Sequence, residues 1–87
     1  MLLYFVYAIK SLSKERIYIG HTKNFKERLQ YHNAGYVKST SNDRPWVPFA
    51  LDKFETKSEA RWIERELKRS SGKRKRWIEE NKVGTLE

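Results

Sequence analysis

The sequence predicts an α+β domain with the element order β-β-α-β-α-α. Two observations carry this prediction. Short runs of β-branched and aromatic residues bounded by turn residues predict strands, and Asn or Thr followed three positions later by glutamate predicts helix starts. The chain has 87 residues, of which 38% are hydrophobic and 14% aromatic. This is enough for one modest core and too little for a catalytic domain plus a targeting domain, so a single domain over 1–87 is expected.

Residues 2–20 are expected to form an antiparallel hairpin. The run LLYFVYAIK (2–10) is apolar on both alternating faces, which is typical of a central strand covered on both sides. A polar turn (11–15) follows, and RIYIG (16–20) forms the second strand. The apolar start is too short to cross a bilayer and lacks a basic leader, so neither a membrane segment nor a targeting segment is expected.

The first helix is expected from Asn24 to about Asn33. Asn24 and Glu27 have the spacing of a capping box, and Gly35 suits the left-handed position that follows a helix end. The next stretch, GYVKSTSNDRPWVP (35–48), is polar and contains two prolines. It is therefore predicted to be a loop.

The second half of the chain predicts one strand and two helices. FALDKF (49–54) has the composition of a short strand. A second capping box, TKSE (56–59), opens a helix expected over 57–69. The remaining segment (70–81) breaks at Gly72 and restarts as a short basic helix.

The charge of the chain indicates a polyanionic partner. The formal net charge is +8 and the pI is about 9.9, and basic side chains gain free energy when they displace counterions from phosphates. The alternative is a soluble basic protein without a specific partner. The absence of cysteine excludes disulfides and thiolate sites and suits the reducing cytoplasm. The sequence contains no motif of a zinc cluster, of a phosphate-binding Gly-rich loop or of a G-x-S-x-G nucleophile elbow.

The first helix carries an arginine and a histidine near its apolar side. Phe25, Leu29 and His32 fall within one stripe at 100° per residue, and Arg28 lies at its edge. Arginine and histidine at this spacing repel each other if the histidine is charged. A shared target would explain the pair. The alternative is that Arg28 is solvated and that His32 is a half-buried space-filler.

The second helix places a carboxylate at the boundary of its core face. Its apolar stripe consists of Ala60, Ile63 and Leu67, and Glu64 lies close to this stripe. A carboxylate in such a position needs a partner. The partner is either Lys68, four residues further on, or a metal ion.

Tyr7 and Tyr18 lie on the two strands of the expected hairpin. Packing in the core is the default interpretation of each ring, but buried hydroxyls need hydrogen-bond partners. Two such hydroxyls near an arginine, a histidine and a carboxylate suit phosphodiester chemistry. One group activates the nucleophile, a cation stabilises the developing charge, and a metal supports the leaving oxygen. On so basic a chain, this combination favours a nuclease.

Short motifs over nearly the whole chain resemble one known family. The chain resembles the GIY-YIG nuclease domain at FVY (5–7), YIG (18–20), Arg28 and H-N-x-G (32–35). The chain is also similar to the stand-alone bacterial members of this family, which are described as UvrC-like or predicted endonucleases. This similarity lies at RPW (44–46) and S-E-A-x-x-x-E-x-x-L-K (58–68). The resemblance implies a three-stranded antiparallel sheet flanked by helices. Phe5 stands in place of the motif glycine, and Asn81 matches a late family asparagine too poorly to be assigned its role.

The resemblance also implies roles for five residues. Tyr18 or its bound water would be the general base, and Tyr7 would help to orient the attack. Arg28 would hold the scissile phosphate, and His32 would assist proton transfer or position the tyrosine. Glu64 would be the sole protein ligand of one divalent ion, Mg²⁺ or Mn²⁺, whose other ligands are waters and phosphate oxygens.

The expected function is that of a metal-dependent DNA endonuclease that acts by in-line attack of water. It would be directed by DNA structure rather than sequence, act in repair or recombination, and need no small-molecule cofactor. The alternative is a non-catalytic nucleic-acid-binding module or accessory subunit. Six basic residues are expected to contact phosphates: Lys38, Lys68, Lys73, Arg74, Lys75 and Arg76. Trp77, within this run, is expected in the core rather than stacked on a base.

Overall fold

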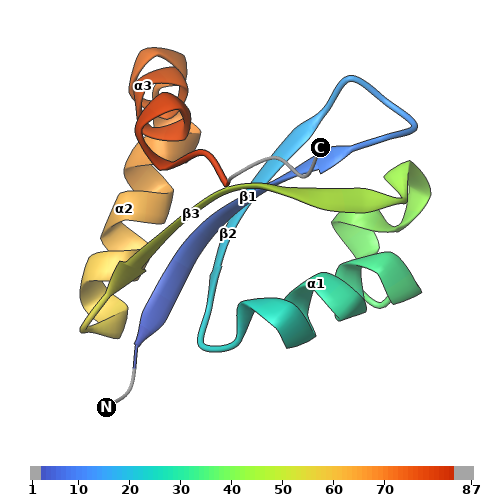
Figure 1. The fold of residues 1–87 in the computed structure, drawn as a ribbon, viewed down its shortest axis with the longest axis horizontal. Helices are drawn as coiled ribbons and strands as arrows, with labels where there is room; N and C mark the ends of the chain where they lie inside the picture. Colours follow the sequence, from blue (N-terminus) through green and yellow to red (C-terminus); the bar gives the residue numbers. More distant parts are fainter. Residues whose placement is uncertain (1–2, 84–87) are drawn as a thin grey trace.

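A three-stranded antiparallel sheet lies between two helical layers in the computed structural model, which describes residues 3–83 (Figure 1). The strand order is β2-β1-β3, so β1 is central and the other two are edge strands. The strands are β1 (Tyr4–Ser11), β2 (Ile17–Thr22) and β3 (Trp46–Phe54). The helices are α1 (Phe25–Ala34), α2 (Lys57–Arg69), α3 (Ser71–Asn81) and the short 3₁₀ helix η1 (Lys38–Asp43). This arrangement confirms the predicted fold class. Leu2, placed in the first strand by the prediction, lies outside the described residues.

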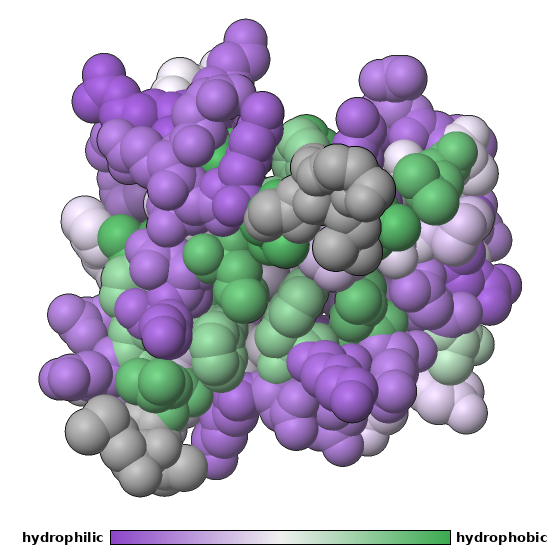
Figure 2. Space-filling model, viewed as in Figure 1, coloured by the Kyte–Doolittle hydropathy of each residue, from purple (hydrophilic) through white to green (hydrophobic). Residues whose placement is uncertain are grey.

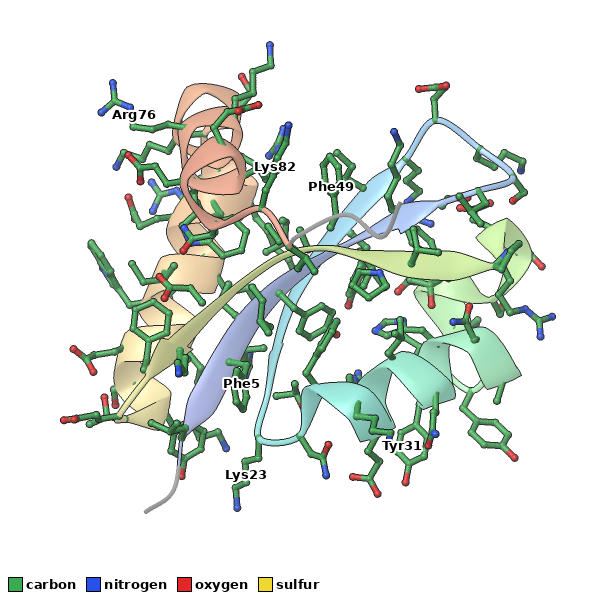
Figure 3. The ribbon with its side chains drawn as sticks, viewed as in Figure 1. Phe5, Lys23, Tyr31, Phe49, Arg76 and Lys82 are labelled. Atoms are coloured by element: carbon green, nitrogen blue, oxygen red, sulfur yellow. The ribbon has the colours of Figure 1, made fainter. Side chains whose placement is uncertain are left out.

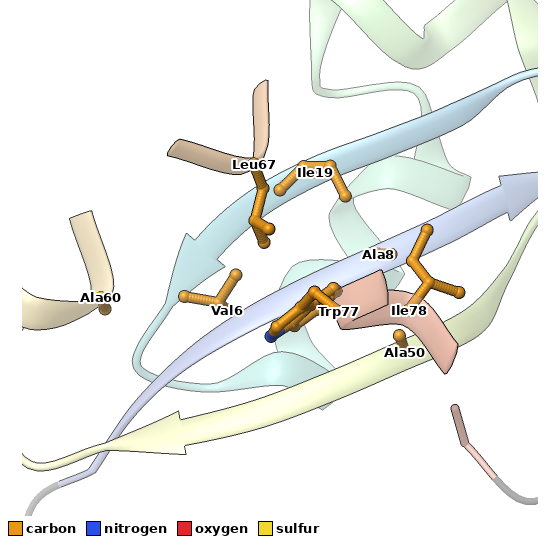
Figure 4. Packing of buried hydrophobic residues seen from close by; sticks show 8 residues of the cluster. All are labelled: Val6, Ala8, Ile19, Ala50, Ala60, Leu67, Trp77 and Ile78. Carbon is orange, nitrogen blue, oxygen red and sulfur yellow. The ribbon is translucent and has the colours of Figure 1, made fainter. Parts of the chain in front are cut away.

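The central strand is buried on both faces, as its apolar pattern predicts. Val6 and Ala8 belong to a cluster that α2 and α3 complete (Figure 4). Tyr7 and Ile9 point to the opposite face, where side chains of α1 pack against them. Trp77 is 8% exposed within the first cluster, which confirms its place in the core. β1 therefore separates two small cores and contributes to both.

The predicted helix ends are confirmed by their hydrogen bonds. The Asn24 side chain accepts from the Glu27 backbone N–H at 3.1 Å, and the Thr56 hydroxyl accepts from the Glu59 N–H at 3.1 Å. Gly35 follows α1 with φ = 86°, a conformation that side-chain-bearing residues rarely adopt. These local interactions fix both ends of α1 and the start of α2.

The loop predicted over 35–48 is partly wrong, because η1 occupies its middle and β3 begins at Trp46. Pro48 does not end the strand, for two reasons. β3 is an edge strand, where a missing N–H is tolerated. The register also shifts between Ala8 and Ile9, where β1 pairs with β3, and such bulges accommodate irregular residues.

The predicted break before the last helix is also misplaced by a few residues. α3 begins at Ser71 and includes Gly72. The reason is a cap that the prediction did not consider, because the Ser70 hydroxyl accepts from the Lys73 backbone N–H at 3.2 Å. The C-terminal end of α2 and the start of α3 thus meet at one residue, which holds the two helices against the same face of the sheet.

The surface reflects this layered arrangement. Figure 2 shows hydrophilic residues over the α2 and α3 layer and over the α1 layer, with hydrophobic residues between them across the sheet. Among the helices of residues 3–83, none is long and apolar enough to cross a membrane.

Candidate active site

Tyr7 and Tyr18 lie on neighbouring strands and point to the same face of the sheet. In the antiparallel register Tyr7 is opposite Gly20 and Tyr18 is opposite Ile9, so the tyrosines are diagonal neighbours. Their ring centroids are 6.4 Å apart. Tyr7 is 1% exposed, whereas Tyr18 is half-buried and borders open surface. Of the two residues, Tyr18 is therefore the more accessible to a ligand.

The position of the Tyr7 ring requires the glycine at position 20. A Cβ atom on Gly20 would lie 2.5 Å from Tyr7 Oη and 2.7 Å from Cζ, far inside the usual contact distance of non-bonded heavy atoms. The absence of a side chain lets the Tyr7 ring lie directly against the backbone of β2.

His32 connects the Tyr7 hydroxyl to the 3₁₀ helix. Its side chain is fully buried, with Nε2 2.8 Å from Tyr7 Oη and Nδ1 2.8 Å from Thr40 Oγ1. Where the Thr40 hydroxyl donates its one hydrogen to the Val37 carbonyl, 3.3 Å away, it accepts from His32 Nδ1–H. His32 Nε2 is then a free acceptor for the Tyr7 O–H. With this tautomer of His32, the buried hydrogen bonds run in one direction, from Tyr7 to Val37.

Burial favours the neutral form of both members of this pair. Desolvation, assisted by the charge of Arg28, lowers the pKa of His32 to about 4. Desolvation also raises the pKa of Tyr7 to about 12, although Arg28 acts in the opposite direction. A neutral histidine and a protonated tyrosine are the states that the hydrogen-bond pattern needs.

Arg28, half-buried on α1, is the cation beside this pair. Its charge lowers the pKa of both Tyr7 and His32. Among residues 3–83, no carboxylate forms an ion pair with Arg28. A half-buried arginine without a counter-ion attracts an anion, and its planar fork suits the oxygens of a phosphate.

Glu64 brings a carboxylate to the site from α2. Its side chain is 16% exposed, and Oε2 is 2.7 Å from Lys68 Nζ, while Oε1 contacts Nδ1 of His21 on β2. Burial alone would raise the pKa of Glu64, but Lys68 and His21 outweigh it and lower the pKa. Lys68 Nζ also lies 5.4 Å from the centroid of the Tyr18 ring. The salt bridge predicted for Glu64 is therefore present, and it forms beside Tyr18 rather than away from it.

A basic groove begins at Tyr18 and extends toward α3. It has a volume of about 610 Å³ and contains one acidic side chain, that of Glu15. Its basic lining comes from the hairpin, α2 and α3: Lys10, Arg16, Lys68, Arg74 and Lys75. Such a surface attracts a phosphate backbone whatever the base sequence.

A comparison with known families agrees with this geometry. The profile of the GIY-YIG catalytic domain matches residues 3–77, which include both tyrosines, the arginine, the histidine and the carboxylate. The chain belongs to the GIY-YIG family of nucleases. It is also 38% identical over 79 residues to a UPF0213 protein of Staphylococcus haemolyticus, and the match covers 88% of this chain and 95% of that protein.

The GIY-YIG residues predicted from the sequence come together at the β2 edge of the sheet. Tyr7, Arg28 and His32 form one connected group, in which the pKa of Tyr7 also responds to the charge of Glu64. Tyr18 contacts His32, with ring centroids 5.1 Å apart. Arg28 is half-buried, and His32 is fully buried and hydrogen-bonded rather than half-buried. Their roles in catalysis stay predictions.

Sequence reasoning missed two residues of this GIY-YIG site, Thr40 and His21. Thr40 belongs to a Ser/Thr-rich stretch that predicts only a loop, and it gains its position from η1. His21 follows YIG directly, and the strand alternation that turns Tyr18 toward α1 turns His21 toward α2. That alternation is the signal that could have assigned His21 to Glu64.

The predicted phosphate-binding residues fall into two groups. Lys68, Arg74 and Lys75 line the basic groove. Lys73 instead forms an ion pair with Glu66 at 2.8 Å. The other two do not line the groove: Arg76 points away from the sheet on the outer side of α3 (Figure 3), and Lys38 lies at the start of η1. The groove also contains Lys10 and Arg16, which the prediction did not include.

GIY-YIG nucleases generally depend on a divalent metal ion, and the donor set here fits one limited kind of site. Within residues 3–83, no group of three or more His, Cys, Asp or Glu side chains could hold a metal. Glu64 is the carboxylate at the tyrosines, and both of its oxygens already face cationic or hydrogen-bonding nitrogen atoms. A single carboxylate suits Mg²⁺, which keeps most of its water ligands. The ion would take the place of at least one of these nitrogen partners.

Proposed function

We propose that the protein is a metal-dependent DNA endonuclease that hydrolyses a phosphodiester bond by in-line attack of water. One observation carries the proposal: Arg28, half-buried and without a carboxylate partner among residues 3–83, acts on the buried Tyr7 and His32, which contact Tyr18. Positioned cations at a developing phosphorane charge are the main need of phosphoryl-transfer catalysis.

The nucleophilic water would be bound between the two tyrosines. Tyr18 borders the groove, so its hydroxyl or a water bound to it can accept a proton from the nucleophile. With its own hydrogen donated to His32 Nε2, 2.8 Å away, Tyr7 would keep its oxygen lone pairs to accept a hydrogen bond from the same water. Tyr7 therefore orients the attack, and His32 positions Tyr7.

The phosphate would be held from α1 and α2. Arg28 would bind the non-bridging oxygens and stabilise the charge that develops on them. Glu64 would hold the divalent ion, Mg²⁺ or Mn²⁺, which when bound supplies positive charge at the leaving oxygen. Lys68 pairs with Glu64 here, and it would move to a phosphate when the ion binds.

The groove supports recognition of DNA structure rather than sequence. Its polar lining is lysine and arginine apart from Glu15, Tyr18 and backbone groups, and such side chains position a phosphate backbone without reading bases. An enzyme of this kind would act on branched or interrupted DNA in the cytoplasm, in repair or recombination.

The test is cleavage of a panel of nicked, branched, flapped and single-stranded DNA with Mg²⁺ or Mn²⁺. Glu64→Gln should reduce cleavage on the order of 100-fold or more, because the charge that holds the ion is lost. Glu66→Gln is the matched control: it makes the same change on the same helix, at a carboxylate that pairs with Lys73 and Arg69. It should cut as well as the wild type.

A non-catalytic nucleic-acid-binding module is the competing function. It would bind DNA in a salt-dependent manner, and neither metal nor Glu64→Gln would alter the binding. Failure to cut any substrate with either metal, or equal cutting by Glu64→Gln and the wild type, would refute the proposed activity.

A further inference from the structure

An exposed tryptophan on α2 has no role in the proposed site. Trp62 is 57% exposed, whereas Trp46 and Trp77 are 2% and 8% exposed. Its ring borders a shallow hollow of about 290 Å³, which Ser58, Arg61 and Arg65 also line. The other two tryptophans serve the cores, so Trp62 contributes little to folding.

The arginines beside Trp62 are available to an anion. Among residues 3–83, neither Arg61 nor Arg65 forms an ion pair with a carboxylate. Both also line a second hollow, of about 370 Å³, together with Glu64 and other side chains of α2 and β2. The two hollows thus share their arginines and connect the carboxylate of the site to Trp62.

The order of these side chains around α2 forms a path. Measured from Glu64 at about 100° per residue, Arg61 lies about 60° and Arg65 about 100° around the helix. Trp62 lies about 160° around, beyond both arginines. A nucleic-acid strand that leaves the site along this surface would place its phosphates at the arginines and a base at Trp62 a few nucleotides away.

The chemistry of the surface favours a single strand over a protein or a paired duplex. A protein partner would need a contiguous apolar patch, but the neighbours of this ring in the hollow are a serine and two arginines. Guanidinium groups bind phosphates, and an exposed indole stacks on any base that is not paired. A base inside a duplex has no free face for such stacking.

We infer that Trp62 stacks on an unpaired base a few nucleotides from the cleaved phosphate, so that the preferred substrate carries single-stranded nucleotides on one side of the scissile bond. This inference rests on the proposed function, because the roles proposed for Arg28 and Glu64 define where the phosphate lies. It adds to that function the class of DNA that the enzyme selects.

The test measures binding without metal, so that no cleavage occurs. Wild type, Trp62→Ala and Trp62→Phe are titrated with a labelled duplex and with the same duplex carrying a single-stranded flap. Trp62→Ala should bind the flap substrate about five-fold to about 100-fold more weakly, with unchanged affinity for the duplex. Trp62→Phe should restore most of the affinity, because a phenyl ring also stacks. Unlabelled oligo(dT) should quench the tryptophan emission of the wild type and not that of Trp62→Ala.

Leu12→Ala is the matched control, since it removes another exposed apolar side chain, 64% exposed, from the loop after β1. It should leave both affinities unchanged. Equal flap binding by wild type and Trp62→Ala would overturn the inference, as would an equal loss for flap and duplex. If the wild type cuts DNA while Trp62→Ala shows either result, the inference fails and the proposed function stands. If the wild type binds no DNA, both fail.

Discussion

Replacing Thr40 by valine removes one buried hydroxyl and almost nothing else from the side chain. Thr40 is fully buried, and its hydroxyl accepts from His32 Nδ1–H at 2.8 Å and donates to the Val37 carbonyl at 3.3 Å. Each lost hydrogen bond costs about 1 kcal/mol, and a buried N–H without a partner costs about 1–3 kcal/mol. The lost bond to Val37 and the unpaired His32 N–H together should therefore lower the free energy of unfolding of Thr40→Val by about 2–4 kcal/mol.

Two measurements check this prediction. Urea unfolding gives the loss of stability, with Ser39→Ala as the control, because Ser39 is exposed in the same 3₁₀ helix and should change stability by less than about 0.5 kcal/mol. Nitrogen NMR of His32 should show the proton on Nδ1 in the wild type and a shift toward Nε2 in Thr40→Val. The proton order proposed for Tyr7 and His32 is refuted if Thr40→Val is as stable as the control and the histidine tautomer does not change.

Two further predictions follow from the same region. Gly20→Ala should cost about 1–3 kcal/mol in urea unfolding, because its Cβ would overlap the Tyr7 ring. Gly72→Ala is the control, because its Cβ would meet no atom closer than 4.0 Å. It should raise the free energy of unfolding by about 0.5–1 kcal/mol. Equal effects of the two substitutions on this free energy would contradict the role given to Gly20. Because burial lowers the pKa of His32 from 6.5 to about 4, the unfolded chain binds the proton more readily. Stability should thus be highest above pH 6.5 and fall by up to about 3 kcal/mol as the pH drops to 4, and an equally steep fall in His32→Gln would refute this assignment.

The parts of the fold that sequence predicts well are set by neighbours in the chain. The caps at Asn24 and Thr56 need only a residue three positions away, and both are present. The start of β3 was missed because the tolerance of Pro48 depends on its edge position and on a register shift in β1. Neither property can be obtained from the local sequence.

The same distinction applies to the site. Motif spacing predicts which strands and helices carry the tyrosines, Arg28 and Glu64. It does not predict the state of His32, because its partners Tyr7 and Thr40 come from a strand and from a segment that resembles a loop. Likewise, the second partner of Glu64, His21, is 43 residues away in sequence. Contacts between distant segments therefore decide what each side chain can do.

The double burial of β1 has a consequence for how this molecule can move. One strand supplies Tyr7 to the candidate site, Val6 and Ala8 to the core beneath α2 and α3, and hydrogen bonds to both edge strands. Local openings of low free energy occur where buried contacts are few, and β1 is the opposite case. Tyr7 is thus anchored to the segment that should exchange its amide hydrogens last. Motion that admits a substrate is therefore expected in the exposed side chains of the groove, while the buried tyrosine stays in place until the whole domain unfolds.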